Sequence, residues 1–393
     1  MTTDIKEEAI ALSPPWLELF RAIHQRPELG CQERHTAALI RRRLKELGIP
    51  CTPLADTGTV AVIQGAYPGR TVGFRADMDA LPIPEASALP YASRTPGVMH
   101  ACGHDFHTAA LLGAAELLWK RRGGLHGAVK LFFQPDEEGD GGAARMIAAG
   151  CMEAPHVDAM LCCHVDSSIP TGTLSTRSGP ACASSNPFAV TLRGRGSHGA
   201  KPHLGTDVIV AGAQVITAVQ TISSRRTSPT EPVVVTIGSF HSGGAGNVLP
   251  EEARFSGIIR TMSTEARKRV TADFCAIVTG VAAAMGVEAE IEMTDGYPCC
   301  HNDRAVTELL LNAAAKVLGP ENILEQEAPT LGTDDFGYFS AAVPGCYYYI
   351  GVGNEAKGYT YPNHNPRFTA DPDALPLAAA VEAQAALDFL AEG

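Results

Sequence analysis

Residues 105–138 read DFHTAALLGAAELLWKRRGGLHGAVKLFFQPDEE, and this stretch predicts one repeat of an alternating helix-strand fold. Apolar side chains recur with a helical period over Asp105–Arg122, and the basic last turn suits the carboxyl end of a helix. Gly123 and Gly124 then end the helix, and the apolar run Ala128–Phe133 has the composition of a buried strand. Strands that alternate with helices predict an α/β fold with a mostly parallel sheet covered by helices on both faces.

The same alternation is expected on both sides of this stretch. Before it, the sequence predicts helices at Leu17–Arg26 and Glu33–Leu47 and strands at Thr59–Gln64 and Thr71–Arg75. After it, the helices and strands alternate again, in the order Gly141–Ala149, Ala159–His164, Arg304–Leu318, Tyr347–Val352 and Ala374–Ala391.

The order of elements changes near Pro187. Six elements then follow as β-α-β-β-α-β, the ferredoxin-like arrangement: Phe188–Arg193, Thr206–Arg225, Val233–Phe240, Ala253–Arg260, Thr264–Met285 and Glu288–Thr294. We therefore predict one domain built from residues 1–186 and 298–393, with a smaller α+β domain of residues 187–297 inserted into it.

Composition excludes several classes of protein. The 393 residues are 45% hydrophobic and 19% charged, which is enough apolar material for sizeable cores and excludes global disorder. The net charge of -12 argues against nucleic acid or an anionic membrane as the main partner. No uninterrupted apolar stretch is long enough to span a membrane, and the acidic start MTTDIKEEAIAL does not resemble a signal peptide. The eleven cysteines are an odd number without the pattern of a disulfide framework, so we expect a cytoplasmic protein with mostly buried thiols.

The densest group of potential metal ligands is HACGHDFH at residues 100–107, just before a predicted helix. Cys102 and His104 are separated by one residue, a spacing that differs from a zinc-ribbon CxxC but lets both side chains point into one cavity. The alternative interpretation is a polar loop in which Asp105 caps the helix.

A second cluster, QPDEEGDGG at residues 134–142, directly follows a buried strand. Its acids Asp136, Glu137, Glu138 and Asp140 would repel one another at the carboxyl end of a sheet unless cations hold them. Of the two adjacent glutamates, one can bind a metal while the other accepts and donates a proton. A solvated acidic turn is the simpler interpretation of this segment when it is taken alone.

Two histidines extend the set of ligands. His164 ends another buried strand of the same polarity, and His364 lies in the turn PNHNP after a tyrosine-rich strand. A lone loop histidine is usually polar surface, but cysteine, histidines and glutamate together suit one or two divalent metals such as zinc or manganese.

The predicted inserted domain holds a third group of candidates. His198 lies in GRGSHGAKPH, Asn247 ends SGGAGN, and Arg260 lies at a strand end. Each can donate hydrogen bonds to an oxyanion or a carboxylate, although ordinary turn and strand-end chemistry is the alternative interpretation.

Together and in this order, these motifs resemble the M20 family of metallopeptidases and amidohydrolases over nearly the whole chain. The likeness is closest to the branch of hippurate hydrolases, N-acyl-amino-acid amidohydrolases and plant auxin-conjugate hydrolases. The matching stretches are FRADMDALP (74–82), HACGHDFH (100–107), QPDEEG (134–139), SHGAKPH (197–203) and NVLP (247–250), with His164, Asp335-Phe336 and His364.

The resemblance implies a metal-dependent hydrolase that cleaves the amide bond of N-acyl amino acids with a metal-activated water. It implies two divalent ions, zinc or manganese, with Cys102 bridging them and a ligand set of Cys102, His104, Glu138, His164 and His364. Glu137 matches the general base, and Asp79 matches an acid that orients the site.

The resemblance also implies a homodimer that forms through the inserted domain. His198 would then reach the partner's active site to hold the oxyanion, while Asn247 and Arg260 would hold the carbonyl or carboxylate of a small-molecule substrate. Asp136 departs from the family pattern, in which a small residue precedes the glutamate pair.

Other functions are compatible with the same residues. An aminohydrolase acting on an aromatic acid and a carboxypeptidase or dipeptidase would use the same metal machinery. A non-catalytic binding protein is disfavoured by the complete ligand set. A zinc-dependent ring deaminase is disfavoured because the chain contains no C-x-x-C.

Overall fold

The computed structural model describes residues 4–392, which divide into two compact units. Unit 1 consists of residues 4–181, 301–329 and 338–392, and unit 2 of residues 182–300 and 330–337.

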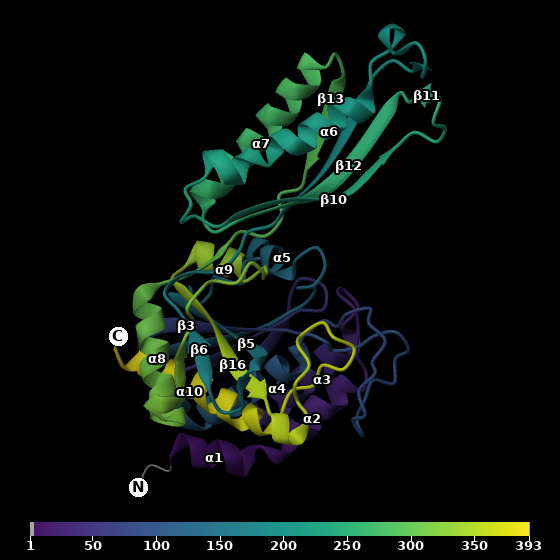
Figure 1. The fold of residues 1–393 in the computed structure, drawn as a ribbon. Helices are drawn as coiled ribbons and strands as arrows, with labels where there is room; N and C mark the ends of the chain where they lie inside the picture. The colour runs from purple at the N-terminus through teal and green to yellow at the C-terminus, as the bar shows by residue number, and fades with distance from the viewer. Residues whose placement is uncertain (1–3, 393) are drawn as a thin grey trace. The chain divides into compact units, whose positions relative to one another are not determined.

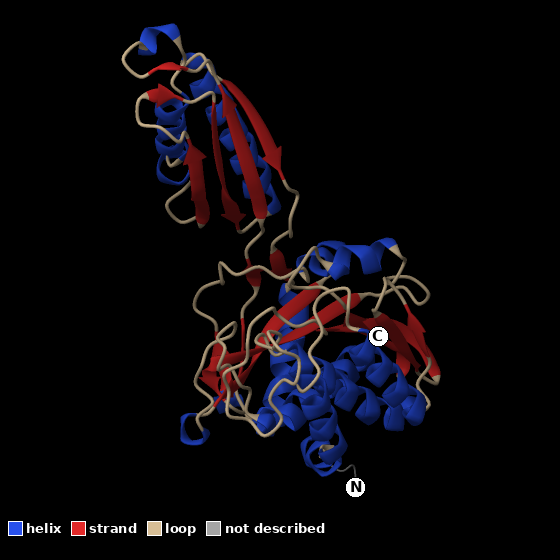
Figure 2. Cartoon of the chain, turned by 90° about the vertical axis from the view of Figure 1, so that its right-hand side faces the viewer, coloured by secondary structure: helices blue, strands red, loops and turns tan. Residues whose placement is uncertain are grey.

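An eight-stranded sheet forms the centre of unit 1 (Figures 1 and 2). Its strands lie in the order β1-β2-β4-β3-β5-β16-β6-β15. Neighbouring strands run parallel from β4 through β3 and β5 to β16, whereas β1, β2 and β6 join the sheet through antiparallel pairs. The strands of this sheet are β1 (Cys51–Pro53), β2 (Thr59–Gln64), β3 (Tyr67–Asp77), β4 (His126–Gln134), β5 (Ala159–Pro170), β6 (Leu174–Thr176), β15 (Ile323–Glu325) and β16 (Gly345–Gly353).

Helices cover both faces of this sheet, so the predicted fold class is confirmed. The larger helices lie on one face, and α5 and α9 lie on the other, where Phe339 of α9 contacts Phe132 of β4 with ring centroids 5.6 Å apart (Figure 1). The helices of unit 1 are α1 (Ile5–Leu12), α2 (Pro14–His24), α3 (Arg34–Leu47), α4 (His104–Arg121), α5 (Gly142–Ala148), α8 (Arg304–Leu318), α9 (Gly337–Ala342) and α10 (Leu375–Ala391).

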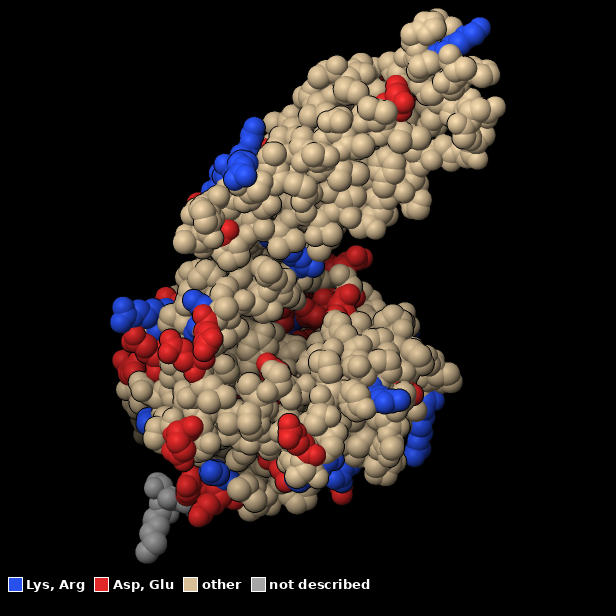
Figure 3. All heavy atoms as spheres, in the orientation of Figure 1, with Lys and Arg blue, Asp and Glu red and all other residues tan. Residues whose placement is uncertain are grey.

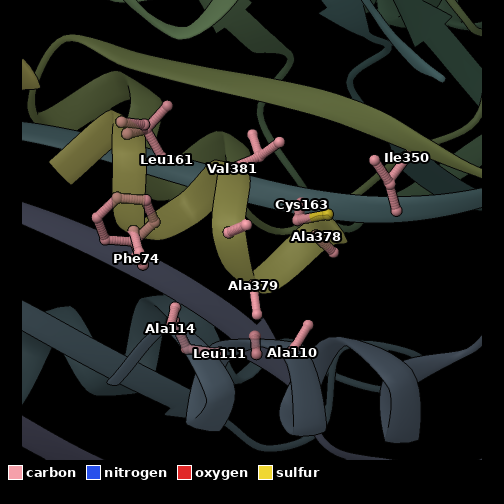
Figure 4. Packing of buried hydrophobic residues seen from close by; sticks show 14 of the residues in the cluster. Phe74, Ala110, Leu111, Ala114, Leu161, Cys163, Ile350, Ala378, Ala379 and Val381 are labelled. Atoms are coloured by element: carbon pink, nitrogen blue, oxygen red, sulfur yellow. The ribbon is translucent and has the colours of Figure 1, made fainter. Parts of the chain in front are cut away.

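Helix α10 is almost wholly apolar because it is a core helix. Figure 4 shows Ala378 and Ala379 of α10 between strand residues such as Phe74 and the α4 residues Ala110 and Leu111. In the described chain α10 is the one helix long and apolar enough to cross a membrane, yet 72% of that segment is buried inside the structure. Packing within unit 1 therefore accounts for its composition.

Unit 2 contains a four-stranded antiparallel sheet with the order β10-β12-β8-β13. Helices α6 and α7 pack on one face of the sheet, where Phe188 of β8 meets Phe274 of α7 with ring centroids 4.3 Å apart. The order of strands and helices is the predicted ferredoxin-like one. Its elements are β8 (Asn186–Arg193), α6 (Val208–Val219), β10 (Val233–Ser242), β12 (Glu252–Thr261), α7 (Thr264–Ala284) and β13 (Glu288–Met293), with a small ribbon of β9 (Ser197–His198) and β11 (Val248–Leu249).

Residues 330–337 belong to unit 2, although the predicted insertion is 187–297. The reason is local pairing, because the N–H of Ala183 donates to the carbonyl of Gly332 at 2.9 Å and Cys182 forms a parallel bridge with Thr330. Two further short strands, β7 (Gly179–Cys182) and β14 (Cys300–Asn302), pair with each other.

Glu382 of α10 is a buried acid, and it generates a prediction about stability. The side chain is 2% exposed, and its Oε2 has no hydrogen-bond partner within residues 4–392. Burial raises the pKa of Glu382 from 4.5 to about 8, so the folded protein keeps a proton that the unfolded chain loses. We therefore expect the free energy of unfolding to fall by at most about 5 kcal/mol as the pH rises from about 4.5 to about 8.

Urea unfolding at a series of pH values measures this effect. The chain's two tryptophans, Trp16 and Trp119, both lie in unit 1, so their fluorescence reports the unit that contains Glu382. Glu382→Gln should flatten the pH dependence and raise the free energy of unfolding at pH 8, whereas the exposed control Glu7→Gln should change neither. Equal pH slopes for wild type and Glu382→Gln would show that this carboxyl is not the titrating group.

Candidate metal centre

Ligand-type side chains gather at one edge of the sheet in unit 1. The neighbouring strands β3, β4, β5 and β16 are parallel, so their carboxyl ends share this edge. The candidate residues follow or end these strands or lie at the start of α4: Asp79 after β3, Glu137 and Glu138 after β4, His164 in β5, His364 after β16, and Cys102 and His104 beside the start of α4.

The thiol of Cys102 lies at the centre of this group. Its Sγ is 3.5 Å from Nε2 of His164 and 3.3 Å from Nε2 of His364. His364 Nε2 in turn lies 3.1 Å from Oε1 of Glu138. Within each of two sets, Cys102-His104-His164 and Cys102-Glu138-His364, the ligand atoms lie within 4.8 Å of one another. The two sets share Cys102, which is the arrangement expected of two adjacent cation positions.

The predicted base joins the same group. One ligand atom each from Glu137, Glu138 and His104 also lie within 4.8 Å of one another, and Glu137 is 7% exposed. The structure therefore brings together all five predicted metal ligands and the predicted base, although these residues are spread over most of the chain.

Hydrogen bonds to one ring nitrogen of His104 and of His164 leave the other nitrogen facing the group. Asp79 Oδ1 lies 3.2 Å from Nδ1 of His104, whose Nε2 is buried and has no hydrogen-bond partner in the described chain. His164 donates from Nδ1 to the carbonyl of Val165 at 2.8 Å, which turns Nε2 toward Cys102. Metal-binding histidines are commonly held through their other nitrogen in this way, so these residues fit one or two divalent metals.

Asp79 holds two of the segments together. Its Oδ1 forms a hydrogen bond with Nδ1 of His104, and its Oδ2 accepts the backbone N–H of Glu138 at 2.9 Å. Because Asp79 is only 1% exposed, these contacts keep the α4 start and the acidic turn in register.

The pKa shifts describe a site that stabilises positive charge. Hydrogen bonds with Cys102 and Glu138 raise the pKa of His364 to about 10. Burial alone would raise the pKa of Glu138, but the hydrogen bond from His364 and the nearby charges of His104 and His364 lower it. Burial also raises the pKa of the Cys102 thiol, and the charge of Glu138 adds to this shift. The carboxylate of Glu138 and the thiol of Cys102 beside His364 therefore form a site that favours a positive charge.

Beneath the ligands lies a buried network that the sequence analysis missed. Asp77 accepts from Nη1 of Arg75 and from Nδ1 of His107, both at 2.6 Å, and His107 Nε2 accepts the N–H of Val165 at 2.9 Å. These bonds fix the neutral tautomer of His107 and connect β3, α4 and β5. Burial would raise the pKa of Asp77, but His104, Arg75 and His107 lower it well below 3.8. The sequence signal for this network was the pair Arg75 and Asp77, two charged residues at the end of an otherwise apolar strand.

The alternative interpretation of Asp105 as a helix cap is wrong. The N-cap of α4 is Gly103, which has a φ of 88°, and no side chain caps the helix. Asp105 instead accepts from Nδ1 of His24 at 2.6 Å, while Nε2 of His24 lies 3.3 Å from Glu85. Burial would lower the pKa of His24, but these two carboxylates raise it to about 9.

Two of the predicted substrate-facing residues of unit 2 lie together on the β9-β11 ribbon. His198 pairs with Val248, and the N–H of Gly199 donates to the carbonyl of Asn247 at 2.7 Å. The N–H of Ala200 donates to Nδ1 of His198 at 3.0 Å, so the exposed imidazole carries its proton on Nε2.

Arg260 lies at the other end of unit 2. Strand β12 begins at Glu252, beside the ribbon, and eight extended residues later reaches Arg260, a span of about 27 Å. Its Nη1 is buried without a hydrogen-bond partner in residues 4–392. Burial lowers the pKa of this guanidinium. One chain therefore does not bring Arg260 together with His198 and Asn247.

Comparison with known proteins identifies the family. Residues 73–388 match the model of peptidase family M20/M25/M40. The chain belongs to this family. The predicted resemblance is therefore confirmed, and with it the class of enzyme, a metal-dependent amidohydrolase that cleaves C–N bonds.

Several relatives match over nearly their whole length. Thermostable carboxypeptidase 2 of Saccharolobus solfataricus is 38% identical over 95% of both chains. N-acetyl-L-cysteine deacetylase of Bacillus subtilis is 38% identical over 94% of this chain and 88% of its own. IAA-amino acid hydrolase ILR1-like 4 of Arabidopsis thaliana is 36% identical over 95% of this chain and 85% of its own.

Solved structures agree with this grouping. A dinuclear metal binding peptidase from the M20 family of Bacillus subtilis has a TM-score of 0.84 and 34% identity, covering 97% of this chain and 99% of its own. A protein from methicillin resistant Staphylococcus aureus has a TM-score of 0.94 and 34% identity, covering 99% of this chain and 100% of its own.

The buried network generates a prediction about Asp77. Asp77→Asn keeps the shape of the side chain but removes the buried negative charge that accepts from Arg75 and His107, which should cost about 3–5 kcal/mol of unfolding free energy. The matched control is Asp158→Asn, which should cost at most about 1 kcal/mol. Within residues 4–392 Asp158 accepts only the N–H of Thr71, and the amide oxygen of asparagine can still accept it. Urea unfolding followed by tryptophan fluorescence compares the two, and equal costs would contradict the role given to Asp77.

Proposed function

We propose that this chain hydrolyses the amide bond of N-acyl amino acids at a centre of two divalent metal ions, zinc or manganese. The observation that carries the proposal is the pair of ligand sets that share Cys102, with Glu137 beside them. The deacetylase of Bacillus subtilis and the IAA-amino acid hydrolase of Arabidopsis thaliana support an N-acyl amino acid as substrate. The carboxypeptidase of Saccharolobus solfataricus favours a second candidate, hydrolysis of a C-terminal peptide bond.

In this proposal, five side chains hold the ions: Cys102, His104, Glu138, His164 and His364. Metal ions bound there would lower the pKa of a water molecule and polarise the substrate carbonyl. Asp79 keeps His104 and Glu138 in place through the two hydrogen bonds described above.

Glu137 is proposed as the general base. It is buried, it lies next to the ligands His104 and Glu138, and its own position in the acidic turn leaves Glu138 to bind the ion. Its carboxylate takes the proton of the attacking water and returns it to the leaving nitrogen, so one residue serves both steps.

Arg260 is proposed to bind the carboxylate of the substrate, and Asn247 is proposed to donate a hydrogen bond to the substrate carbonyl. The support for Arg260 is its half-buried guanidinium with a nitrogen that has no hydrogen-bond partner in the described chain. A planar guanidinium can form two parallel hydrogen bonds to a carboxylate, which suits an amino acid end group.

We further propose a homodimer in which His198 acts in the partner's site. About 27 Å of strand separates the ribbon of His198 from Arg260, so both can contact one small substrate only if they come from different copies. Helix α6 contains no charged residue and exposes Ile209 and Val210, and the side of unit 2 seen in Figure 3 has few charged side chains. Such a face suits contact with a second copy.

The cytoplasm is the proposed compartment. All eleven cysteines are free thiols, and most of them are buried in the structure. A chain with this many unpaired thiols is suited to a reducing environment.

A substrate panel tests the reaction. The metal-loaded protein is assayed with N-acetyl, N-benzoyl and indole-acetyl amino acids, with dipeptides and C-terminal peptides, and with amino-substituted aromatic acids. We expect the highest kcat/KM for N-acyl amino acids, its loss on chelation and its return when zinc or manganese is added back. Faster release of C-terminal residues, or of ammonia from the aromatic acids, would overturn the substrate class.

Glu137→Gln is the catalytic control in this panel. It should lower kcat by roughly a thousandfold because the base is lost, while the metal content per chain stays unchanged. The matched control Glu153→Gln, at an exposed position, should leave turnover intact. Near-normal turnover in Glu137→Gln would show that another group is the base.

Mixing experiments test the dimer. We expect His198→Ala and Glu137→Gln to be nearly inactive as separate proteins. A mixed dimer would contain one site with an intact Glu137 from one copy and an intact His198 from the other, so activity should return after mixing under subunit exchange. Failure to regain activity, with mixed dimers present by mass spectrometry, would exclude the proposed exchange of His198.

A further inference from the structure

Asp136 has an unusual backbone at the point where β4 leads into the acidic turn. Its φ of 55° lies in the left-handed region, which residues other than glycine seldom adopt. Such a conformation costs free energy and persists only where surrounding contacts hold it.

The backbone of Asp136 is held on its N–H side by Glu33. Oε1 of Glu33 accepts this N–H at 2.9 Å, and Oε2 accepts the hydroxyl of Thr57 at 2.6 Å. Glu33 is fully buried, so the acceptor is itself fixed in position.

The carboxylate of Asp136 is held on two sides. Nη2 of Arg145 donates to Oδ2 at 3.0 Å. Oδ1 lies against two glycines, because a Cβ on Gly30 would lie 1.9 Å from it and a Cβ on Gly139 would lie 2.3 Å from it. The side chain therefore fills a space that no larger residue at either position would leave open.

The carbonyl of Asp136 completes the set of contacts. It accepts the N–H groups of Gly141 and Gly142, both at 3.1 Å, and Gly142 begins the helix that carries Arg145. On the other side of Glu137, the carboxylate of Asp79 accepts a hydrogen bond from the N–H of Glu138. Glu137 thus lies between two residues whose backbones are anchored by separate segments of unit 1.

We propose that Asp136, Arg145 and Glu33 are positioning residues that set the direction of the Glu137 carboxylate. This inference rests on the proposed function, in which Glu137 is the general base. These three residues form the Asp136 anchor. Its role follows from geometry, because a base must lie within hydrogen-bond reach of the proton it takes and small misplacements reduce the rate steeply.

Asp136→Gly is the informative variant. Glycine adopts a positive φ without cost, so this change removes the contact with Arg145 and leaves the backbone unstrained. We expect kcat to fall by roughly 10- to 100-fold, since the base is misdirected. KM and the metal content per chain should stay close to wild type, because Asp79 still anchors Glu138.

Conservative and double variants separate positioning from general stability. Asp136→Asn tolerates the left-handed backbone and still accepts from Arg145, so it should recover most of kcat. Arg145→Met should resemble Asp136→Gly, and the double variant should be no worse than either single one, because both changes break the same contact. Arg304→Met, which breaks an exposed pair with Glu308 on α8, is the matched control and should leave kcat unchanged.

Cys31 provides a readout that does not involve catalysis. Its Sγ lies 3.2 Å from Nη2 of Arg145 and is exposed. Burial and the neighbouring Asp136 raise the pKa of this thiol, whereas Arg145 lowers it. Alkylation of Cys31 by iodoacetamide, followed by peptide mass spectrometry, should therefore become faster in Asp136→Gly and slower in Arg145→Met.

The results distinguish the anchor from the proposed function. If Glu137→Gln abolishes turnover but Asp136→Gly keeps kcat within about twofold of wild type, the anchor is overturned and the base remains. If Glu137→Gln stays active, the proposed function fails whatever Asp136 does. An unchanged alkylation rate in both anchor variants would show that the contact with Arg145 does not persist in solution, which also overturns the proposal.

Discussion

A charge buried inside a protein must be balanced by groups that contact it. In unit 1 this constraint applies to the carboxylate of Asp77. Arg75 supplies a positive charge from the same strand, and His107 of α4 donates a hydrogen bond. The other nitrogen of His107 accepts the N–H of Val165 in β5. Helix α4 and strand β5 carry the predicted ligands His104 and His164, and β3 leads into Asp79, which contacts His104. The contacts that neutralise this buried anion therefore also fix the segments of His104 and His164 relative to each other, so stability and site geometry depend in part on the same contacts.

Long periodic elements could be predicted from the sequence, and short ones could not. The helix expected at Asp105–Arg122 is α4, His104–Arg121, because its length and apolar period leave little ambiguity. Strands β6 and β15 have three residues each, which is too short for any period to show. The helix expected from Leu17 begins instead at Pro14, since proline is well suited to the first turn of a helix.

The candidate ligands could be predicted because Glu138 and His164 stand at the ends of apolar strands, where a parallel sheet collects its functional side chains, and Cys102, His104 and His364 stand in short runs rich in ligand-type residues. Their supporting contacts could not, because those contacts join residues far apart in the chain. His24 meets Asp105 across 81 positions, and Glu33 meets the backbone of Asp136 across 103. Only the fold shows that a histidine in an early helix and an acid in a later helix are partners, or that His198 and Arg260 lie at opposite ends of one domain.

Two residues of the candidate site, the predicted ligand His364 and Asp136 beside the predicted base, have left-handed backbones, with φ of 66° and 55°. A survey of the chain for stabilising substitutions would rank glycine first at both positions, since it relieves backbone strain. In this protein the exchange would relieve backbone strain but remove the contact of Asp136 with Arg145 and the imidazole of His364 beside Cys102 and Glu138. A heat-resistant version of this protein should therefore gain its stability at positions outside the candidate site.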